Sequence, residues 1–168
     1  KPENNVMMTN DDVLGDKIPC EQEIQLRELC LKMLGLHPPN TRGHAHFPGS
    51  HLVSLDRENL KKLRQRKYFV TGKADGTRYM LLVSSDGCYL IDRNFKFRRN
   101  QMRFPCKNMT ESHQFTLLDG EMIIDTISPG KQEGRYLIYY VSAVNGLTLV
   151  KRTFCERCNL IEKEVVEP

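Results

Sequence analysis

The chain has 168 residues, of which 39% are hydrophobic and 27% are charged, and this composition is that of a globular domain large enough to bury a hydrophobic core. Its formal net charge of +4 is compatible with an anionic partner such as a nucleotide or RNA, without requiring one. No apolar run approaches the roughly 20 residues of a membrane helix, and the six cysteines form no dense disulfide framework, so we expect no membrane partner and a reducing compartment.

The N-terminal part is expected to contain a polar tail followed by a helix. Residues 1–19 are polar and predict a linker or tail outside the core, so the domain is assigned to residues 20–168. Apolar positions at helical spacing then predict a helix over residues 21–34. Gly35 follows where a helix stop belongs.

A second helix is expected to begin after Asp56, whose side chain is suited to cap it, and to end near residue 66. Leu60 and Leu63 are expected on the inner face of this helix. Basic residues gather in its second half and again further along the chain, which suits an anionic partner and equally an ordinary solvated surface. These residues are Lys61, Lys62, Arg64, Arg66, Lys67, Arg93, Lys96, Arg98, Arg99 and Arg103.

The hydrophobic period then changes from that of a helix to that of strands. Strands are expected over residues 68–70, 79–83, 88–92, 115–125 and 136–144. Asp-Gly, Pro-Gly and Asn-Gly pairs after three of these segments predict hairpin turns, which join antiparallel strands. Helical spacing returns from Phe154 onward. The sum is an α+β domain with a mostly antiparallel sheet.

The most informative segment is Lys73-Ala74-Asp75-Gly76-Thr77-Arg78, which lies between two predicted strands. Gly76 lets the chain turn tightly and approach a ligand, and Arg78 at the start of the next strand can reach the same place. Lys73 is a potential nucleophile toward the α-phosphate of a nucleotide. The alternative is an exposed lysine that pairs with Asp75 in a turn.

Nucleophilic attack requires the neutral amine of Lys73. The ordinary pKa of lysine is about 10.4, so at pH 7 only on the order of 0.1% is unprotonated. Burial or nearby positive charge has to lower that pKa for the lysine to react. A divalent metal ion would offset the charge on the phosphates and on the departing pyrophosphate.

Several segments resemble one known family. The KxDGxR pattern at Lys73 is similar to motif I of the covalent nucleotidyltransferases, which comprise mRNA capping enzymes and nucleic-acid ligases. Asp119-Gly120-Glu121-Met122 resembles motif III, and the run 135–139 resembles motif IIIa. The FPG…VS pattern of residues 47–54 is similar to capping enzymes and is not typical of ligases. Over residues 10–168 the chain thus resembles the guanylyltransferase domain of eukaryotic mRNA capping enzymes, of the plant and animal type in which an RNA triphosphatase domain comes first.

The resemblance implies roles for the residues around motif I. Lys73 matches the nucleophile that takes GMP from GTP and passes it to the 5′-diphosphate end of RNA, which forms the GpppN cap. Arg78 matches the arginine that binds the ribose. Asp75 and Gly76 match positions that shape the turn.

The resemblance also assigns motifs III and IIIa. Glu121 matches the carboxylate that binds ribose and supports the metal site, and Asp119 is expected to support its strand. Tyr139 matches the aromatic residue that stacks on guanine; the alternative is a plain core position in a strand. The next residue departs from the family, which usually has an aspartate where this chain has Tyr140.

The family further implies an antiparallel-sheet nucleotidyltransferase domain, ATP-grasp-like, of the DNA ligase and capping enzyme superfamily. It implies Mg²⁺ or Mn²⁺ as cofactor, GTP and 5′-diphosphate RNA ends as substrates, a phosphorylated RNA polymerase II tail as a partner, and the nucleus as location. Motifs IV to VI are not found in the sequence up to Pro168. In the family these motifs supply a metal-binding acid, the lysines of the α-phosphate site and the C-terminal OB domain. We therefore expect this chain alone to be weak or inactive.

Two alternatives remain open at this point. An ATP-dependent RNA or DNA ligase of the same superfamily would use the same lysine with a different nucleotide. A non-catalytic fragment that binds RNA or a polymerase tail would use none of this chemistry, and Tyr140 and the early end of the chain favour it.

Overall fold

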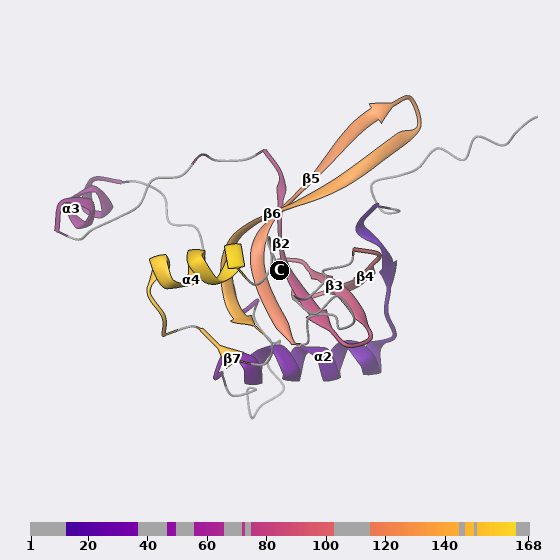
Figure 1. The fold of residues 1–168 in the computed structure, drawn as a ribbon, viewed down its shortest axis with the longest axis horizontal. Helices are drawn as coiled ribbons and strands as arrows, with labels where there is room; N and C mark the ends of the chain where they lie inside the picture. Colours follow the sequence, from indigo (N-terminus) through magenta and orange to yellow (C-terminus); the bar gives the residue numbers. More distant parts are fainter. Residues whose placement is uncertain are drawn as a thin grey trace, which may run out of the picture.

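The computed structural model describes residues 13–36, 47–49, 56–65, 72, 75–102, 115–144, 147–149 and 151–163. Within them, seven strands form one sheet in the order β1-β4-β3-β2-β5-β6-β7, and every pairing is antiparallel (Figure 1). The strands are β1 (Asp16–Lys17), β2 (Thr77–Ser84), β3 (Gly87–Ile91), β4 (Phe97–Asn100), β5 (Thr116–Ser128), β6 (Lys131–Val144) and β7 (Leu147–Thr148). The helices are α2 (Cys20–Met33), α3 (Arg57–Gln65) and α4 (Phe154–Ile161). The expectation of an α+β domain with an antiparallel sheet is confirmed.

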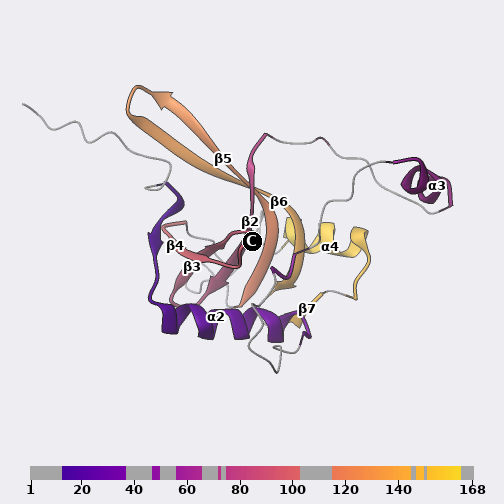
Figure 2. The ribbon, with the colours of Figure 1, turned by 180° about the vertical axis from the view of Figure 1, so that it is seen from behind.

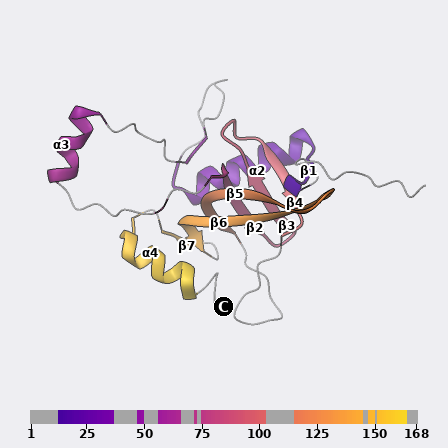
Figure 3. The same ribbon diagram turned by 90° about the horizontal axis from the view of Figure 1, so that it is seen from above.

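The centre of the sheet is buried on both faces. Met80 and Leu82 of β2 belong to one hydrophobic cluster, and Leu81 and Val83 belong to another. Successive side chains of a strand point to opposite faces, so the continuous apolar run of β2 supplies both clusters. Helix α2 covers the first face and α4 lies against the second (Figure 3).

Helix α2 is held against the sheet by apolar and polar contacts. Cys30 is fully buried in the cluster of the first face, where burial raises its pKa to about 12 and keeps the thiol protonated. Gly35 follows the helix with φ of +69°, a conformation that favours glycine, and this confirms the expected stop. The helix itself begins at Cys20 and ends at Met33, close to the predicted range.

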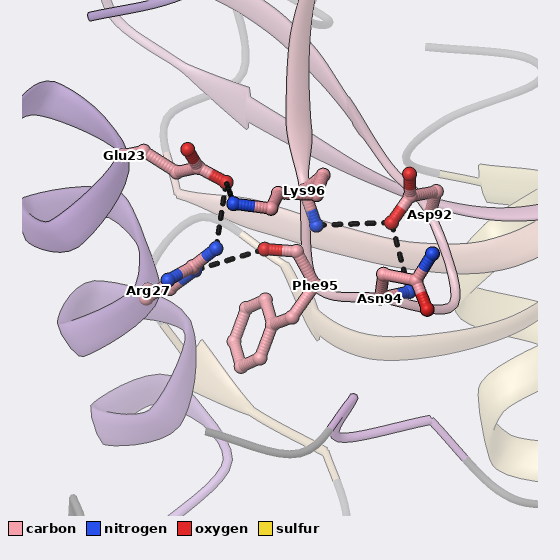
Figure 4. Close-up of polar contacts among 6 residues, drawn as sticks. All are labelled: Glu23, Arg27, Asp92, Asn94, Phe95 and Lys96. Carbon is pink, nitrogen blue, oxygen red and sulfur yellow. Dashed lines mark hydrogen bonds and ion pairs between the residues drawn. The ribbon is translucent and has the colours of Figure 1, made fainter. Parts of the chain in front are cut away.

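A polar cluster joins α2 to the turn between β3 and β4 (Figure 4). The guanidinium of Arg27 donates to Glu23 at 2.7 Å and to the carbonyl oxygen of Phe95 at 2.9 Å, and it lies 5.6 Å from the centre of the Phe95 ring. The ammonium of Lys96 lies 3.8 Å from the same Glu23 carboxylate. Asp92 accepts from the backbone of the same turn. These contacts hold Phe95 fully buried despite its positive φ of 59°.

The polar tail expected over residues 1–19 is wrong for its last part, while residues 1–12 lie outside the described residues. Strand β1 pairs with β4, and Leu14 and Ile18 pack against the two clusters. Asn100 donates to the carbonyl oxygens of Val13 and Leu14 at 2.9 and 3.1 Å. A few apolar residues spread through a polar segment are enough to attach it to a sheet edge. They form no helical or strand periodicity from which this attachment could be predicted.

Helix α3 forms as predicted, but its inner face does not. The side chain of Asp56 accepts from the backbone N–H of Asn59 at 2.7 Å, which is the expected cap. Leu60 and Leu63, however, are 45% and 42% exposed, and the helix has no buried residue. Figure 1 shows α3 standing apart from the sheet. The helical period thus predicted the helix correctly. The prediction that Leu60 and Leu63 face the interior is wrong.

Some of the strands agree with the prediction from the sequence and others do not. The segment 68–70 lies outside the described residues. Strand β4 was not expected, because its sequence is dominated by basic residues; its ends, Phe97 and Asn100, are nevertheless buried. Strands β5 and β6 exist as predicted but are longer, and their distal halves extend as a hairpin beyond the rest of the sheet (Figures 1 and 2). Along this hairpin the residues of β6 alternate between exposed and half-buried.

Candidate active site

The centre of the candidate site is an ion pair between β2 and β5. Arg78 lies opposite Glu121 in the strand register, and Met80 lies opposite Asp119. The guanidinium of Arg78 reaches diagonally to Asp119: Nε donates to Oδ1 at 3.0 Å and Nη2 to Oδ2 at 2.5 Å. Two parallel hydrogen bonds between a guanidinium and a carboxylate fix both planes, so this pair is a rigid element of the site.

Strand alternation places this pair on the face that α2 covers, at the end of the apolar cluster. The side chains of Arg78 and Asp119 are only 16% and 12% exposed. The hydrogen bond that Arg78 donates to Asp119 raises the pKa of Arg78, and the charge of Glu121 adds to that effect. The ring of Phe47, itself buried, lies 5.4 Å below the guanidinium carbon. Arg78 is therefore a fixed positive charge between two carboxylates and an aromatic ring.

Glu121 is the residue of this group that has an unsatisfied hydrogen-bond acceptor. Its Oε2 is buried and has no hydrogen-bond partner among the described residues. A buried carboxylate oxygen without a hydrogen-bond partner lowers the stability of the folded state, and such atoms in native proteins often bind a ligand or an ion. Glu121 is thus a half-buried carboxylate, and its binding role stays a prediction.

The chain before β2 approaches the same place. A β-carbon added to Gly76 would lie 2.8 Å from the carbonyl oxygen of Met122 and 3.2 Å from the β-carbon of Glu121, so only glycine lets the backbone come this close. Asp75 is exposed beside it. Lys73 lies outside the described residues.

A bulge in β6 carries Tyr139. Asp119 lies opposite Tyr140, and Gly120 lies opposite Ile138, so Tyr139 is an extra residue between two paired ones. A β-carbon on Gly120 would lie 2.0 Å from the carbonyl oxygen of Leu137, and the bulge therefore requires glycine there. The side chain of Tyr139 is 40% exposed. The alternative of a core position for Tyr139 is wrong.

Three contacts around the site were not expected from the sequence. Phe47 was noticed as part of the FPG pattern, without a role toward Arg78. The hydroxyl of Tyr136 donates to the carbonyl oxygen of Tyr79 at 2.7 Å across the sheet, and burial raises the pKa of Tyr136 well above its ordinary range, so it stays a neutral donor. Tyr140 is covered by Arg157 of α4, whose guanidinium carbon lies 3.9 Å from the ring centre. No local pattern points to a contact between residues so far apart in sequence.

The structure thus brings together Arg78, Asp119, Glu121 and Gly76, and it places Tyr139 on the neighbouring strand. Asp119 has a more direct role than expected, since it binds Arg78 rather than only supporting its strand. Among the described residues, no group of three or more histidine, cysteine, aspartate or glutamate side chains is placed to hold a metal ion. No helix in the same part of the chain has the length and apolar character of a membrane span.

Comparison with known proteins identifies the family. The model of the mRNA capping enzyme, catalytic domain, matches residues 8–168. The mRNA-capping enzyme of Danio rerio is 43% identical over 125 residues, which cover 73% of this chain and 21% of that protein. The mRNA-capping enzyme subunit alpha of Neurospora crassa is 33% identical over 166 residues, or 92% of this chain and 40% of that protein. The mRNA-capping enzyme of Caenorhabditis elegans is 32% identical over 98% of this chain and 26% of its own length. The chain thus spans less than half of the length of these relatives, and it belongs to the family of the mRNA capping enzyme catalytic domain.

Proposed function

We propose that this chain is part of an mRNA guanylyltransferase that transfers GMP from GTP, through Lys73, to the 5′-diphosphate end of RNA. The observation that carries the proposal is the group formed by Arg78, Asp119 and Glu121. It combines a fixed cation with a buried, unpartnered carboxylate oxygen, and it lies where the chain from Lys73 enters the sheet. Family membership supports nucleotidyl transfer, and this group supplies the polar surface that a nucleotide needs.

The proposed reaction has two steps, both centred on the α-phosphorus. In the first, the neutral amine of Lys73 attacks the α-phosphorus of GTP, the bond to pyrophosphate breaks, and the amine loses a proton. In the second, an oxygen of the RNA diphosphate attacks the same phosphorus, the phosphorus–nitrogen bond breaks, and the lysine regains a proton. Lys73 has to be unprotonated in the first step, so a lowered pKa of this lysine is part of the proposal.

The described residues would bind the nucleoside part of GTP. The ribose hydroxyls can donate to Glu121, whose Oε2 lacks a partner, and can accept from the guanidinium of Arg78, which Asp119 holds in one orientation. The guanine base would stack on the ring of Tyr139, because aromatic side chains are good platforms for bases and this ring is accessible. Phe47 and Asp119 would act through Arg78, as positioning residues.

The proposed cofactor is Mg²⁺ or Mn²⁺, for which Glu121 would supply a carboxylate oxygen. Mg²⁺ in nucleotide-binding enzymes is usually held by one or two carboxylates together with the phosphates of the substrate, so a single protein carboxylate in this part of the chain is compatible with it. When bound, the ion neutralises charge on the phosphates. Asp119 is not proposed as a ligand, since both of its oxygens accept from Arg78.

The biological setting is also a proposal. GTP and diphosphate-ended RNA would be the substrates, a phosphorylated RNA polymerase II tail would recruit the protein, and capping would take place in the nucleus. These points rest on membership of the mRNA capping enzyme family.

The test is covalent labelling with nucleotide. GTP or ATP labelled at the α-phosphate is incubated with the protein and Mg²⁺, the protein is denatured, and label on the chain is measured. We expect label from GTP, none from ATP, and none in Lys73→Ala. Lys131→Ala, which removes an exposed lysine at the far end of the β5–β6 hairpin, is the matched control and should label like the original chain.

The test is run on the 168-residue chain and on the full product of its gene. Label from ATP would identify a ligase. Absence of label from both nucleotides in both proteins would overturn the catalytic proposal in favour of a binding module. Label only in the full product would mean that the chain holds an incomplete active site.

A further inference from the structure

A short segment far upstream in the chain, residues 47–49, lies directly against Arg78. The ring of Phe47 is 8% exposed and belongs to the apolar cluster of the first face, together with Cys30 of α2. The guanidinium carbon of Arg78 lies 5.4 Å from the centre of this ring, within the range at which an aromatic face attracts a cation. Because the ring is packed into the core, it cannot follow a movement of the guanidinium. Phe47 is therefore a fixed support for Arg78.

Gly49 brings the backbone of this segment against the same two side chains. A β-carbon added to Gly49 would overlap Cε1 of the Phe47 ring and would lie 3.0 Å from Nη2 of Arg78. The φ of Gly49 is not positive, so alanine is compatible with its backbone conformation, and only these contacts exclude a side chain. Nη2 is also the nitrogen that donates to Oδ2 of Asp119. The segment thus contacts the end of the guanidinium that is bound to Asp119.

Asp119 by itself leaves one kind of movement open to the guanidinium. Its two hydrogen bonds, at 3.0 and 2.5 Å, fix the guanidinium of Arg78 relative to the carboxylate. The torsion that turns the carboxylate of an aspartate is soft, however, so the carboxylate and the guanidinium can tilt together. The ring of Phe47 and the backbone of Gly49 lie against the guanidinium and oppose this tilt.

Glu121 offers Arg78 a second carboxylate. It lies opposite Arg78 in the strand register, and its charge adds to the raised pKa of Arg78. A guanidinium that moved toward Glu121 could donate to Oε2, the buried oxygen that has no hydrogen-bond partner among the described residues. The protein itself would then satisfy the acceptor that the proposed function assigns to a ribose hydroxyl. A support at the Asp119 end of the guanidinium opposes this exchange of carboxylates.

We propose that Phe47 and Gly49 are positioning residues for Arg78: the ring and the glycine backbone hold the guanidinium on Asp119, so that the carboxylate of Glu121 stays open for the hydroxyls of a ribose. This inference rests on the proposed function, in which Arg78 and Glu121 bind the ribose of GTP. Phe47 and Gly49 act only through Arg78. Their substitution should weaken the recognition of the ribose hydroxyls without slowing transfer once the nucleotide is bound.

The test measures how much the ribose hydroxyls contribute to binding. GTP and 2′,3′-dideoxy-GTP, which lacks both hydroxyls, are compared by equilibrium binding to the full product of the gene. The original protein should prefer GTP by about tenfold or more, since hydrogen bonds to charged groups are among the stronger ones. Phe47→Leu keeps an apolar side chain and removes the aromatic face. It should bind GTP about fivefold more weakly, while the affinity for dideoxy-GTP and the labelling rate at saturating GTP change less than about twofold.

Phe97→Leu is the matched control for this substitution. Phe97 is a buried phenylalanine of the same cluster, in β4, and its ring stacks on that of Phe95. Phe97→Leu should lower the midpoint of urea unfolding much as Phe47→Leu does, and it should leave the preference for GTP unchanged. Gly49→Ala should weaken GTP binding at least as much as Phe47→Leu. In the Phe47→Leu background it should change GTP affinity less than about twofold, because leucine lacks the Cε1 atom that the new methyl group would overlap.

The outcomes distinguish this inference from the proposed function. An unchanged preference for GTP in Phe47→Leu, or an equal loss of that preference in Phe97→Leu, would overturn the positioning role while leaving guanylyltransfer intact. An original protein that is labelled by GTP without preferring it to dideoxy-GTP would overturn the ribose role of Arg78 and Glu121, and this inference with it. A full product that neither binds nor is labelled by GTP would overturn the proposed function as well.

Discussion

Two arginines of this protein have almost the same kinds of partner, and each lies over an aromatic ring of the same hydrophobic cluster. Arg27 of α2 pairs with the carboxylate of Glu23 at 2.7 Å and lies 5.6 Å from the ring of Phe95. Arg78 of β2 pairs with the carboxylate of Asp119 at 2.5 Å and lies 5.4 Å from the ring of Phe47. In both, a guanidinium is held between an acid and an aromatic ring.

The two clusters differ in what remains unpaired. Around Arg27, Lys96 adds a second cation beside Glu23, and no described side chain there has a buried polar atom without a partner (Figure 4). Around Arg78, Glu121 adds a second carboxylate, and its buried Oε2 has no hydrogen-bond partner in the part of the chain that the structure describes. The first cluster is complete by itself and joins α2 to the sheet. The second has an excess of acceptor capacity, which the proposed binding site would use.

The largest effect is expected from breaking the pair at Arg78. Asp119→Asn removes the negative charge that is hydrogen-bonded to Arg78 and leaves this mostly buried cation with only the more distant charge of Glu121. A fully buried pair would lose about 3–5 kcal/mol, and this partly buried one should lose about 2–3 kcal/mol of unfolding free energy, together with most GTP binding. Urea unfolding and equilibrium binding measure the two losses. A variant as stable as the original would show that the pair contributes little.

A smaller loss, of stability alone, is expected at the complete cluster. Arg27→Ala removes one hydrogen bond to Phe95, one ion pair and one contact with a ring, and should cost about 1–2 kcal/mol. GTP affinity and labelling should stay within about twofold of the original. Arg57→Ala, in the exposed helix α3, is the control and should not change unfolding. If Arg27→Ala weakened GTP binding as much as Asp119→Asn does, the distinction between the clusters would fail.

Substitution of Glu121 should have the opposite effect to substitution of Arg27: a loss of nucleotide binding without a loss of stability. Glu121→Gln keeps the shape of the side chain and removes a half-buried charge whose Oε2 has no hydrogen-bond partner among the described residues, so unfolding free energy should stay the same or rise by up to about 1 kcal/mol. GTP binding or labelling should nevertheless fall at least tenfold. A loss of stability with unchanged nucleotide binding would assign Glu121 to the fold instead of the site.

The smallest effect concerns a third polar group at α2, which is also complete. Gln22 donates to the hydroxyl of Tyr89, and the hydroxyls of Tyr89 and Ser84 both donate to Asp86. The hydrogen bond from Ser84, followed by that from Tyr89, lowers the pKa of Asp86 below its ordinary value of 3.8. A lowered pKa in the folded state means that this group stabilises the protein above the ordinary value and ceases to do so as the pH falls through the folded pKa.

Unfolding measured from pH 7 to pH 2 in the original chain and in Asp86→Asn tests this. The original should be modestly more stable at neutral pH, and the difference should shrink below about pH 4. A difference that is constant with pH would show that Asp86 contributes through hydrogen bonds that do not depend on its charge.

The local patterns of the sequence predicted much of the fold. The helix α2 and its stop at Gly35, the hairpin at Asp86 and Gly87, and the strands β5 and β6 follow from periodicity and turn chemistry, which act over a few residues. The same patterns do not predict β1 and β4, because these strands have few apolar residues. Strand β4 forms by pairing with β3, and β1 pairs with β4 at the edge of the sheet. Nor could they tell that Leu60 and Leu63 are exposed.

The candidate site, like the fold, has features that the sequence predicts and others that only the tertiary structure shows. The sequence by itself determined the family, through short motifs whose residue types and order are specific, and it singled out Arg78, Glu121, Gly76 and Tyr139, while Lys73 stays a prediction outside the described residues. Only the tertiary structure decided that Arg78 pairs with Asp119, that Glu121 keeps a buried oxygen without a partner, and that Arg157 covers Tyr140. The physical reason is that residue type is a local property, whereas strand register, burial and the partner of a charge depend on segments far apart in the chain.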